Sequence, residues 1–366
     1  MKVFKTYKYK LKLTKTQEKR VDSWIGACRY VYNLALETKI EAYKKGVSLS
    51  QYDLQNQLPA LKEVDWIKDV NALTLQDVIA RLNKAYLSFF KGGGFPKWAK
   101  KGEYASITFP RSIIIKPNGF SLEKLGYVKI FKCRMPDGKI KTATLKKENK
   151  GYFLCVSFES ESKKIYHTCE NQAVGIDMGL VKFLTDSNGI VIDNPKHTKK
   201  YEAKLRVKQR SLSRKKKGSR ARLKVKSELS NLHRKISDSR NDFTNKISLQ
   251  YIKENSLIAV EDLKVKNMVK FGNLSKHISD VSWSTFFDKL KYKSEFYEKT
   301  FIKIDPKFTS QKCSSCNHIS KENRLTQSKF LCVECGHQMN ADLNASINIL
   351  GLGKAFVRQR EAIACA

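Results

Sequence analysis

Along residues 2–13 the hydrophobic positions follow the two-residue period of a β-strand. Val3, Tyr7, Tyr9 and Leu11 fall on one face, and lysines alternate with them on the other. Such alternation is typical of a strand that is buried on one side. We therefore predict a half-buried strand at the start of the chain.

The period then lengthens to that of helices. Thr14 and Gln17 have the spacing of a capping box, and apolar residues recur at helical spacing until Gly46. A second helical pattern covers residues 73–90 and ends in a run of glycines. We expect residues 14–90 to form a small helical unit.

From residue 104 the pattern changes to short strands separated by turn residues. The predicted strands include residues 106–109, 113–115 and 127–131, and a hairpin runs through residues 147–156. We expect a compact β unit that the first strand joins. The helical unit is then an insertion in it.

After Cys169 the chain has the pattern of an α/β domain with a mixed sheet. A long basic helical stretch separates the first three strands from the last two, and a helix over residues 283–297 lies between those two. The predicted strands cover residues 173–178, 181–185, 190–192, 256–260 and 300–304.

Charge changes this picture. The 366 residues include 71 Lys and Arg against 35 Asp and Glu, a formal net charge of +36. Such an excess indicates a polyanionic partner, above all nucleic acid. A basic membrane-surface protein is the alternative, but we find no helix with apolar residues opposite a purely basic face. Neither a membrane-spanning apolar run nor a signal core is evident, so we expect an intracellular protein with reduced cysteines.

Four cysteines near the end of the sequence have the spacing C-x2-C-x15-C-x2-C. Two CxxC pairs can present four thiolates to one tetrahedral ion, and this spacing is typical of a zinc ribbon. Two disulfides or four unrelated buried thiols are the alternatives, which a reducing compartment disfavours. The predicted Zn²⁺ ligands are Cys313, Cys316, Cys332 and Cys335.

Residues 199–240 hold 17 Lys or Arg against three acids. Such runs are often only solvated helix faces or disordered arms. Apolar residues spaced along the stretch, among them Leu205, Leu223 and Ile236, would allow a helix to dock while its other sides stay basic, which favours a nucleic-acid cradle. Residues 213–220 are the expected hinge between two helices. The candidate contacts there are Arg214, Lys215, Lys216, Lys217, Arg220 and Arg222.

Three carboxylates follow or open hydrophobic elements in this basic chain. Asp177 lies in a predicted strand, Glu261 follows another, and Asp342 opens the last helix, at separations of 84 and 81 residues. An acid at the end of an element is usually an exposed cap. Together, however, three carboxylates are the hard ligands that Mg²⁺ prefers, and a two-metal site cleaves phosphodiesters.

These residues resemble the TnpB family, transposon-encoded RNA-guided DNA endonucleases related to the type V CRISPR effectors. The resemblance covers almost the whole length of the chain. Its main motifs are Gly175-Ile-Asp-Met-Gly179, Val260-Glu-Asp-Leu263, Ser310-Gln-Lys-Cys-Ser-Ser-Cys316, Cys332-Val-Glu-Cys-Gly336 and Asp342-Leu-Asn-Ala-Ser-Ile-Asn348.

The resemblance implies a multidomain α/β protein. It would have a RuvC-like (RNase H-type) nuclease domain over residues 169–366, with a zinc-ribbon insert at 309–339. A β-barrel-like wedge domain, residues 1–13 and 104–168, would carry a helical recognition domain, residues 14–103.

The resemblance also implies a catalytic role for Asp177, Glu261 and Asp342, with two Mg²⁺ ions, one Zn²⁺ ion, a guide RNA and a double-stranded DNA target in a prokaryotic, nucleoid-associated cytoplasmic protein. Gln76 and Arg81 are candidates to contact a short flanking motif in the DNA, although both could simply face solvent.

One departure from the family motifs has a structural consequence. Asn317 follows Cys316 where a glycine is usual, a swap that a left-handed turn tolerates. Family members whose acids have decayed serve as RNA-guided DNA-binding repressors. All three acids are present here, which favours the nuclease. A zinc-ribbon protein without guide would leave the β unit and the helical insertion unexplained.

Overall fold

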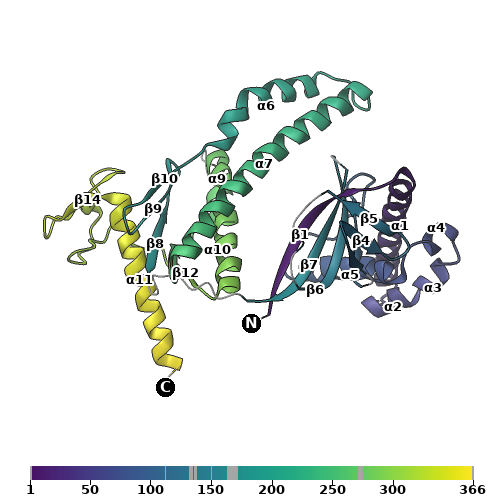
Figure 1. Cartoon of the computed structure of the whole chain (residues 1–366), viewed down its shortest axis with the longest axis horizontal. Helices are drawn as coiled ribbons and strands as arrows, with labels where there is room; N and C mark the ends of the chain where they lie inside the picture. Colours follow the sequence, from purple (N-terminus) through teal and green to yellow (C-terminus); the bar gives the residue numbers. More distant parts are fainter. Residues whose placement is uncertain are drawn as a thin grey trace. The chain divides into compact units, whose positions relative to one another are not determined.

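The structure is a computed structural model that describes residues 2–111, 113–131, 135, 138–149, 151–162, 172–270 and 275–364 (Figure 1). The chain divides into two compact units, Met1–Glu161 and Ser162–Ala366. The predicted boundary at residues 168 and 169 lies outside the described residues, as do Cys133, Cys169 and Cys365.

The first unit contains a seven-stranded antiparallel sheet with the order β2-β6-β7-β1-β5-β4-β3. Its first strand pairs with β7 on one side and β5 on the other, so the prediction that the N-terminal strand joins the β unit is confirmed. Cα atoms of β3 come within 8 Å of those of β6, which curls the sheet toward a barrel. The strands are β1 (Lys2–Lys12), β2 (Ser106–Phe109), β3 (Ile113–Lys116), β4 (Gly119–Leu122), β5 (Gly126–Ile130), β6 (Lys139–Glu148) and β7 (Gly151–Glu161).

Helices of the first unit pack on this sheet. The predicted capping box is present: Thr14 Oγ1 accepts a hydrogen bond from Gln17 N, and Gln17 Oε1 accepts one from Thr14 N. Trp24 of the first helix and Leu75 of the last share one hydrophobic core with Phe120 of the sheet. The helices are α1 (Lys15–Lys44), α2 (Gln51–Asn56), α3 (Leu58–Leu61), α4 (Asp65–Lys68) and α5 (Ala72–Phe90).

The second unit is built on a mixed sheet of order β10-β9-β8-β11-β12. The strand β11 runs parallel to its neighbours β8 and β12. The strand β9 runs antiparallel to β8, and β10 runs antiparallel to β9. The predicted mixed sheet is therefore confirmed, with bounds that differ by at most one residue. The strands are β8 (Ala173–Met178), β9 (Lys182–Asp186), β10 (Val191–Asp193), β11 (Leu257–Glu261) and β12 (Thr300–Ile304).

Helices cover both faces of this sheet. Ile258 and Val260 pack in one cluster with residues of α7 and α10, whereas Ala259 packs with Ile349 of α11. Because neighbouring residues of a strand point to opposite faces, α11 lies on the face opposite to α7 and α10. The helices are α6 (His197–Ser213), α7 (Arg220–Glu254), α8 (Val265–Lys270), α9 (Ser275–Val281), α10 (Trp283–Tyr297) and α11 (Ala341–Ala364).

The predicted basic stretch forms a hairpin in which α6 lies beside α7, with the expected hinge between them (Figure 1). Leu205 and Ile236 are buried in it as predicted, but Leu223 is exposed, so not every leucine of the pattern serves docking. The cysteine-containing segment between β12 and α11 holds a 3-10 turn, η1 (Lys321–Asn323), and a small hairpin, β13 (Lys329–Leu331) with β14 (Gln338–Asn340).

Candidate active site and cysteine cluster

The three predicted carboxylates line one pocket of about 360 Å³. Asp177 lies in β8, Glu261 is the last residue of β11, and Asp342 lies in the first turn of α11. The parallel register of β8 and β11 pairs Ile176 with Val260, the residues just before the two strand acids. The structure therefore brings together three acids that are far apart in the sequence.

Two glycines let α11 approach the sheet closely enough to deliver Asp342. A Cβ atom on Gly175 would lie 2.2 Å from the carbonyl oxygen of Ser346, and a Cβ on Gly353 would lie 2.6 Å from the Cβ of Ala259. Contacts this short are not tolerated. At the start of the helix, Asn340 Oδ1 accepts hydrogen bonds from the backbone N–H groups of Asp342 (3.0 Å) and Leu343 (3.2 Å), which fixes its first turn.

Burial and like charge disfavour ionisation in this pocket. The pKa of Asp177 is raised to about 8, first by burial and then by the negative charges of Glu261 and Asp342. Burial also raises the pKa of Glu261 and of Asp342. A bound cation would be stabilising next to such a set of acids.

Arg324 is the cation that partly offsets these charges. Its Nη2 lies 3.7 Å from Asp342 Oδ1 and donates a hydrogen bond to the carbonyl oxygen of Gln327 (3.1 Å). Its charge lowers the pKa of all three acids against the effect of burial. The arginine comes from the segment between the two cysteine pairs, so this segment contributes a side chain to the acidic pocket.

Thr309 contacts a second acid of the pocket. Its Oγ1 lies within hydrogen-bonding distance of Glu261 Oε1, and this contact lowers the pKa of Glu261. Asn348 of α11 donates to the carbonyl oxygens of Thr309 (3.0 Å) and Lys312 (2.7 Å). The helix that delivers Asp342 therefore also fixes the residue that orients Glu261.

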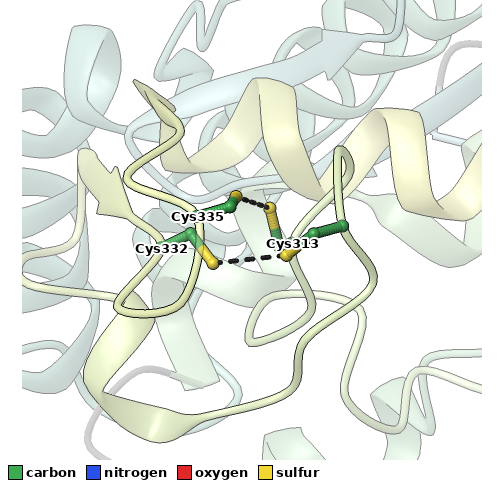
Figure 2. Close-up of side chains that lie close together, drawn as sticks. Cys313, Cys332 and Cys335 are labelled. Atoms are coloured by element: carbon green, nitrogen blue, oxygen red, sulfur yellow. Dashed lines mark hydrogen bonds between the residues drawn. The ribbon is translucent and has the colours of Figure 1, made fainter.

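The four predicted zinc ligands converge. Figure 2 labels three of them, Cys313, Cys332 and Cys335. Their sulfur atoms all lie within 4.8 Å of one another, with 3.8 Å between Cys313 and Cys335 and 3.5 Å between Cys316 and Cys332. Four sulfurs at about 2.3 Å from a tetrahedral zinc ion would be roughly 3.8 Å apart. The donor set and its spacing therefore fit one Zn²⁺ ion.

The two cysteine turns have the same backbone design. Cys313 N donates to the carbonyl oxygen of His318 and Cys332 N to that of His337, both at 2.9 Å. Each turn has one residue in the left-handed region, Asn317 with φ 66° and Gly336 with φ 70°. The expectation that Asn317 occupies a left-handed turn is confirmed.

Asn344 of α11 attaches the first cysteine turn to the helix. Its Oδ1 accepts a hydrogen bond from Ser314 N (3.0 Å), and its Nδ2 donates to the carbonyl oxygen of Lys312 (2.8 Å). The side chain of Asn344 is fully buried. The cysteine cluster and the acidic pocket thus share α11 as their support.

The residues predicted to contact nucleic acid differ in their exposure to solvent. Arg214, Lys216, Lys217 and Arg220 are exposed at the hinge of the hairpin, and Lys215 is half-buried. Arg222 instead donates to the carbonyl oxygens of Leu212 and Lys215, and so holds the end of α6. Its role as a nucleic-acid contact remains a prediction.

On α5, Gln76 is exposed, whereas Arg81 is half-buried. The interpretation that Arg81 simply faces solvent is therefore wrong. Its Nε donates to Asp77 (2.7 Å), and its Nη1 donates to the carbonyl oxygen of Ser106 (3.2 Å) in β2. The guanidinium group connects the helix to the sheet. Contact of either residue with DNA remains a prediction.

Comparison with known proteins assigns the chain to a family. A model described as "Probable transposase" (IS605 OrfB) matches residues 153–272, and a model described as "Cas12f1-like, TNB domain" matches residues 283–349. The chain is 32% identical over 385 residues, 99% of this chain and 96% of the relative, to "Putative RNA-guided DNA endonuclease InsQ" of Escherichia coli (strain K12). The chain belongs to the TnpB (IS605 OrfB) family.

Two further similarities agree with membership in the TnpB family. A protein of Streptomyces pristinaespiralis named "Putative RNA-guided DNA endonuclease" is 32% identical over 364 residues, 96% of this chain and 90% of that protein. A cryo-EM structure of a Cas12f1–sgRNA–target DNA complex has a TM-score of 0.62 at 14% identity, and covers 95% of this chain and 98% of that chain. The fold is therefore Cas12f1-like, with mixed α and β content.

A helix-turn-helix model also matches residues 1–47. The structure has the strand β1 followed by the 30-residue helix α1 there, with no second helix among residues 2–47. In the described part of the chain, none of the helices combines the length and apolarity that crossing a bilayer would require.

Proposed function

We propose that this TnpB-family protein is an RNA-guided DNA endonuclease of the RuvC type. In this proposal it cleaves phosphodiester bonds of target DNA beside a short flanking motif, with Asp177, Glu261 and Asp342 as its catalytic acids. It acts in a prokaryotic cytoplasm, where its DNA target lies.

The observation that carries the proposal is the acidic pocket. Three carboxylates from β8, β11 and α11 line a single cavity in a chain of net charge +36. Burial, and then the negative charge of the neighbouring acids, lowers their tendency to ionise, as the raised pKa of Asp177 illustrates. A stability cost concentrated at one pocket supports a functional role for it.

The three acids would hold two Mg²⁺ ions, which when bound activate a water and stabilise the leaving oxygen of the phosphodiester. Asp177 and Glu261 would be presented by rigid parallel strands. Asp342 would be presented by a helix that two glycines seat against the sheet. Each ligand is thus supported by an element of the core, as a site of defined geometry requires.

Thr309 and Arg324 would tune this centre. Thr309 fixes one rotamer of Glu261, so that its second oxygen can face the substrate. Arg324, paired with Asp342 in the structure, has further guanidinium N–H groups that can donate to a DNA phosphate. The substrate strand would then be clamped between the sheet and the cysteine segment.

The four cysteines would hold one structural Zn²⁺ ion, since four thiolates leave no open position for a substrate. The first unit would comprise the wedge domain and the helical recognition domain, which together would bind the guide RNA and read the flanking motif. Pairing between guide RNA and target strand would read the rest of the sequence.

The test uses neighbouring acids as a matched pair. Glu261 lines the pocket, whereas Asp262 next to it is exposed and lies 3.3 Å from Lys303. Protein purified with its co-expressed RNA is offered plasmid DNA that carries the guide-complementary sequence beside a randomised flank, with Mg²⁺. We expect Glu261→Ala to lower the cleavage rate by at least about a hundredfold, the scale of losing a group that acts in the transition state.

Asp262→Ala should cleave at the wild-type rate. Equal rates for wild type and Glu261→Ala would exclude the proposed centre. The alternative function, an RNA-guided DNA-binding repressor, predicts sequence-specific binding without cleavage by the wild type as well. The presence of all three acids in one pocket favours the nuclease over that alternative.

A further inference from the structure

Aromatic side chains are exposed together at the end of α5 and in the turn that follows. The exposed fraction is 75% for Phe90, 50% for Trp98 and 49% for Phe95, and Phe89 is exposed as well. We call these four residues the aromatic patch. Exposing contiguous apolar surface is unfavourable in water and commonly marks a binding site.

The turn that carries the patch is rigidly built. The backbone N–H of Gly93 donates to the carbonyl oxygen of Ser88 (2.9 Å), and a Cβ on Gly93 would lie 2.7 Å from that oxygen. Farther on, Asn33 of α1 holds Ala99 by two hydrogen bonds, from Ala99 N to Oδ1 (2.8 Å) and from Nδ2 to the carbonyl oxygen of Ala99 (3.1 Å). The chain on both sides of Phe95 and Trp98 is therefore fixed.

The three phenylalanine rings of the patch contact one another, and Phe90 and Phe95 also contact Tyr86 of the core. Phe95 meets Phe89 edge to face, with 5.3 Å between ring centroids and an interplanar angle of 82°. Phe90 meets Phe89 at 5.5 Å. Such packing holds the phenylalanine rings in place and leaves surface of Phe90 and Phe95 open to a partner. The indole of Trp98 is half exposed as well.

The charged residues of the segment that carries the patch have one sign. Residues 84–102 contain no Asp or Glu. All lysines in this range are exposed: Lys84, Lys91, Lys97, Lys100 and Lys101. A partner for this surface offers flat apolar faces and closely spaced negative charges. Unpaired nucleotides have both, because their bases stack on aromatic rings and their phosphates pair with lysines.

We propose that the aromatic patch binds a single-stranded segment of RNA, with bases stacked on Phe90 and Trp98 and phosphates held by Lys97 and Lys101. Double-stranded DNA keeps its base faces stacked inside the duplex, whereas RNA is commonly recognised through unpaired, splayed bases. This inference rests on the proposed function only in taking the RNA to be the guide. The patch would then be a guide-binding site of the first unit, whereas the acidic pocket belongs to the second.

The experiment measures binding of a fluorescein-labelled oligo(U) RNA of about 12 nucleotides at high salt, which weakens phosphate contacts elsewhere on the protein. The variants are Phe90→Ala, Trp98→Ala and the double variant. Tyr52→Ala is the matched control, because Tyr52 is equally exposed in the same unit but neighbours Asp53. We expect about a tenfold loss of affinity for each patch variant and no change for the control.

Two further measurements separate stacking from charge. The salt dependence of oligo(U) binding should be unchanged in the aromatic variants and shallower in Lys97→Gln/Lys101→Gln. In a Trp66→Phe background, oligo(U) should quench Trp98 fluorescence, because Trp24 and Trp283 are buried. Trp98→Phe, which keeps a flat ring, should restore most of the affinity.

The proposal is wrong if the double variant binds oligo(U) like the wild type. It is equally wrong if the patch variants lose affinity only for oligo(dT) or only for phosphatidylserine vesicles. It is also wrong if the substitutions dissociate a dimer and leave RNA binding intact. These outcomes are independent of cleavage. If the patch variants bind RNA normally and the protein cuts DNA, the proposal about the patch is wrong and the proposed nuclease function stands. If the patch variants lose RNA binding and the wild type does not cut DNA, only the proposal about the patch stands.

Discussion

Asp177, Glu261 and Asp342 lie where burial and like charge both oppose ionisation. Two nearby residues favour the ionised forms: Arg324 supplies a positive charge, and Thr309 supplies a hydrogen bond to Glu261. When all three acids are ionised, their negative charges still outnumber the positive charges of Arg324 and Lys182, which both line the pocket. Divalent cations would therefore stabilise the folded protein as well as supply chemistry.

A prediction about Asp177 follows from its raised pKa. Its folded-state pKa is about 8, against an unfolded value of about 3.9. Between these values the folded protein keeps a proton that the unfolded chain has released, so the acid increasingly destabilises the metal-free protein as pH rises through this range. Asp177→Asn removes that cost. Its gain in melting temperature should be small at about pH 5 and larger at about pH 8.5.

Thermal unfolding in EDTA, followed by dye fluorescence, measures this difference. Asp193→Asn is the control, because its hydrogen bond from Lys182 lowers the pKa of Asp193 and the substitution should give no such gain. Mg²⁺ should raise the melting temperature of the wild type more than that of Asp177→Asn. A gain that is the same at both pH values would mean that the three acids do not share a site.

How far single residues could be predicted depended on local signals. The two strand acids and the four cysteines follow from strand period and motif spacing, and Asp342 follows from its place at a helix start. Arg324 and Thr309 carry no such signal: each lies in a segment without periodicity, and one arginine among 71 basic residues is indistinct. Only the folded segment between β12 and α11 brings them to the pocket.

At the scale of elements, α11 is the support that the two candidate sites share. Its first turn presents Asp342, Asn344 holds the first cysteine turn, and Asn348 holds the segment of Thr309. A disturbance of the cysteine cluster should therefore reach the acidic pocket through hydrogen bonds that are already in place. In the proposed function, zinc content and nuclease activity would therefore be linked properties.

Replacement of one cysteine tests this link. Cys332→Ser should lower the zinc content from one equivalent to none by elemental analysis, because a closed four-thiolate site contributes folding energy directly. Cleavage should fall with it. Cys155→Ser, which changes a half-buried thiol of β7, should keep both zinc and activity. A Cys332→Ser protein that is free of zinc and fully active would contradict the structural role of the cluster.

The elements themselves were largely predictable. Strands and helices with clear periods lie within a few residues of their predicted bounds, because burial on one face imposes the period. Sequence patterns did not reveal that α5 and β2 are joined through Arg81, since a polar residue on an apolar helix gives no hint of its partner. The short helices α2, α3 and α4 were also missed, because six or fewer residues show no clear period.

At the scale of the whole molecule, a net charge of +36 has to be reconciled with selectivity. Charge alone attracts any nucleic acid, with an affinity that falls steeply with salt. In the proposed function, base pairing with a guide supplies the selectivity that the basic surface lacks. The protein would then need RNA both to neutralise its charge and to find its target.

Removal of RNA should separate these two contributions. Protein treated with ribonuclease should bind DNA of any sequence, with a logarithmic affinity that falls by about 0.9 per phosphate contact for each tenfold rise in salt. The RNA-loaded protein should cut one sequence beside one flanking motif. We expect sequence-specific cutting to disappear with the RNA and to return when the same RNA is added back; specific cutting by RNA-free protein would refute guide dependence.

The order of the three acids along the chain has a consequence for synthesis. Asp177 and Glu261 leave the ribosome well before α11, which carries Asp342 and packs across the sheet at Gly175. If the acids act as proposed, a growing chain already has the first unit and the basic hairpin while its nuclease centre is still incomplete. The proposed function would then allow the new chain to bind RNA before it is able to cut, and a prematurely terminated product without α11 would lack one of the three acids.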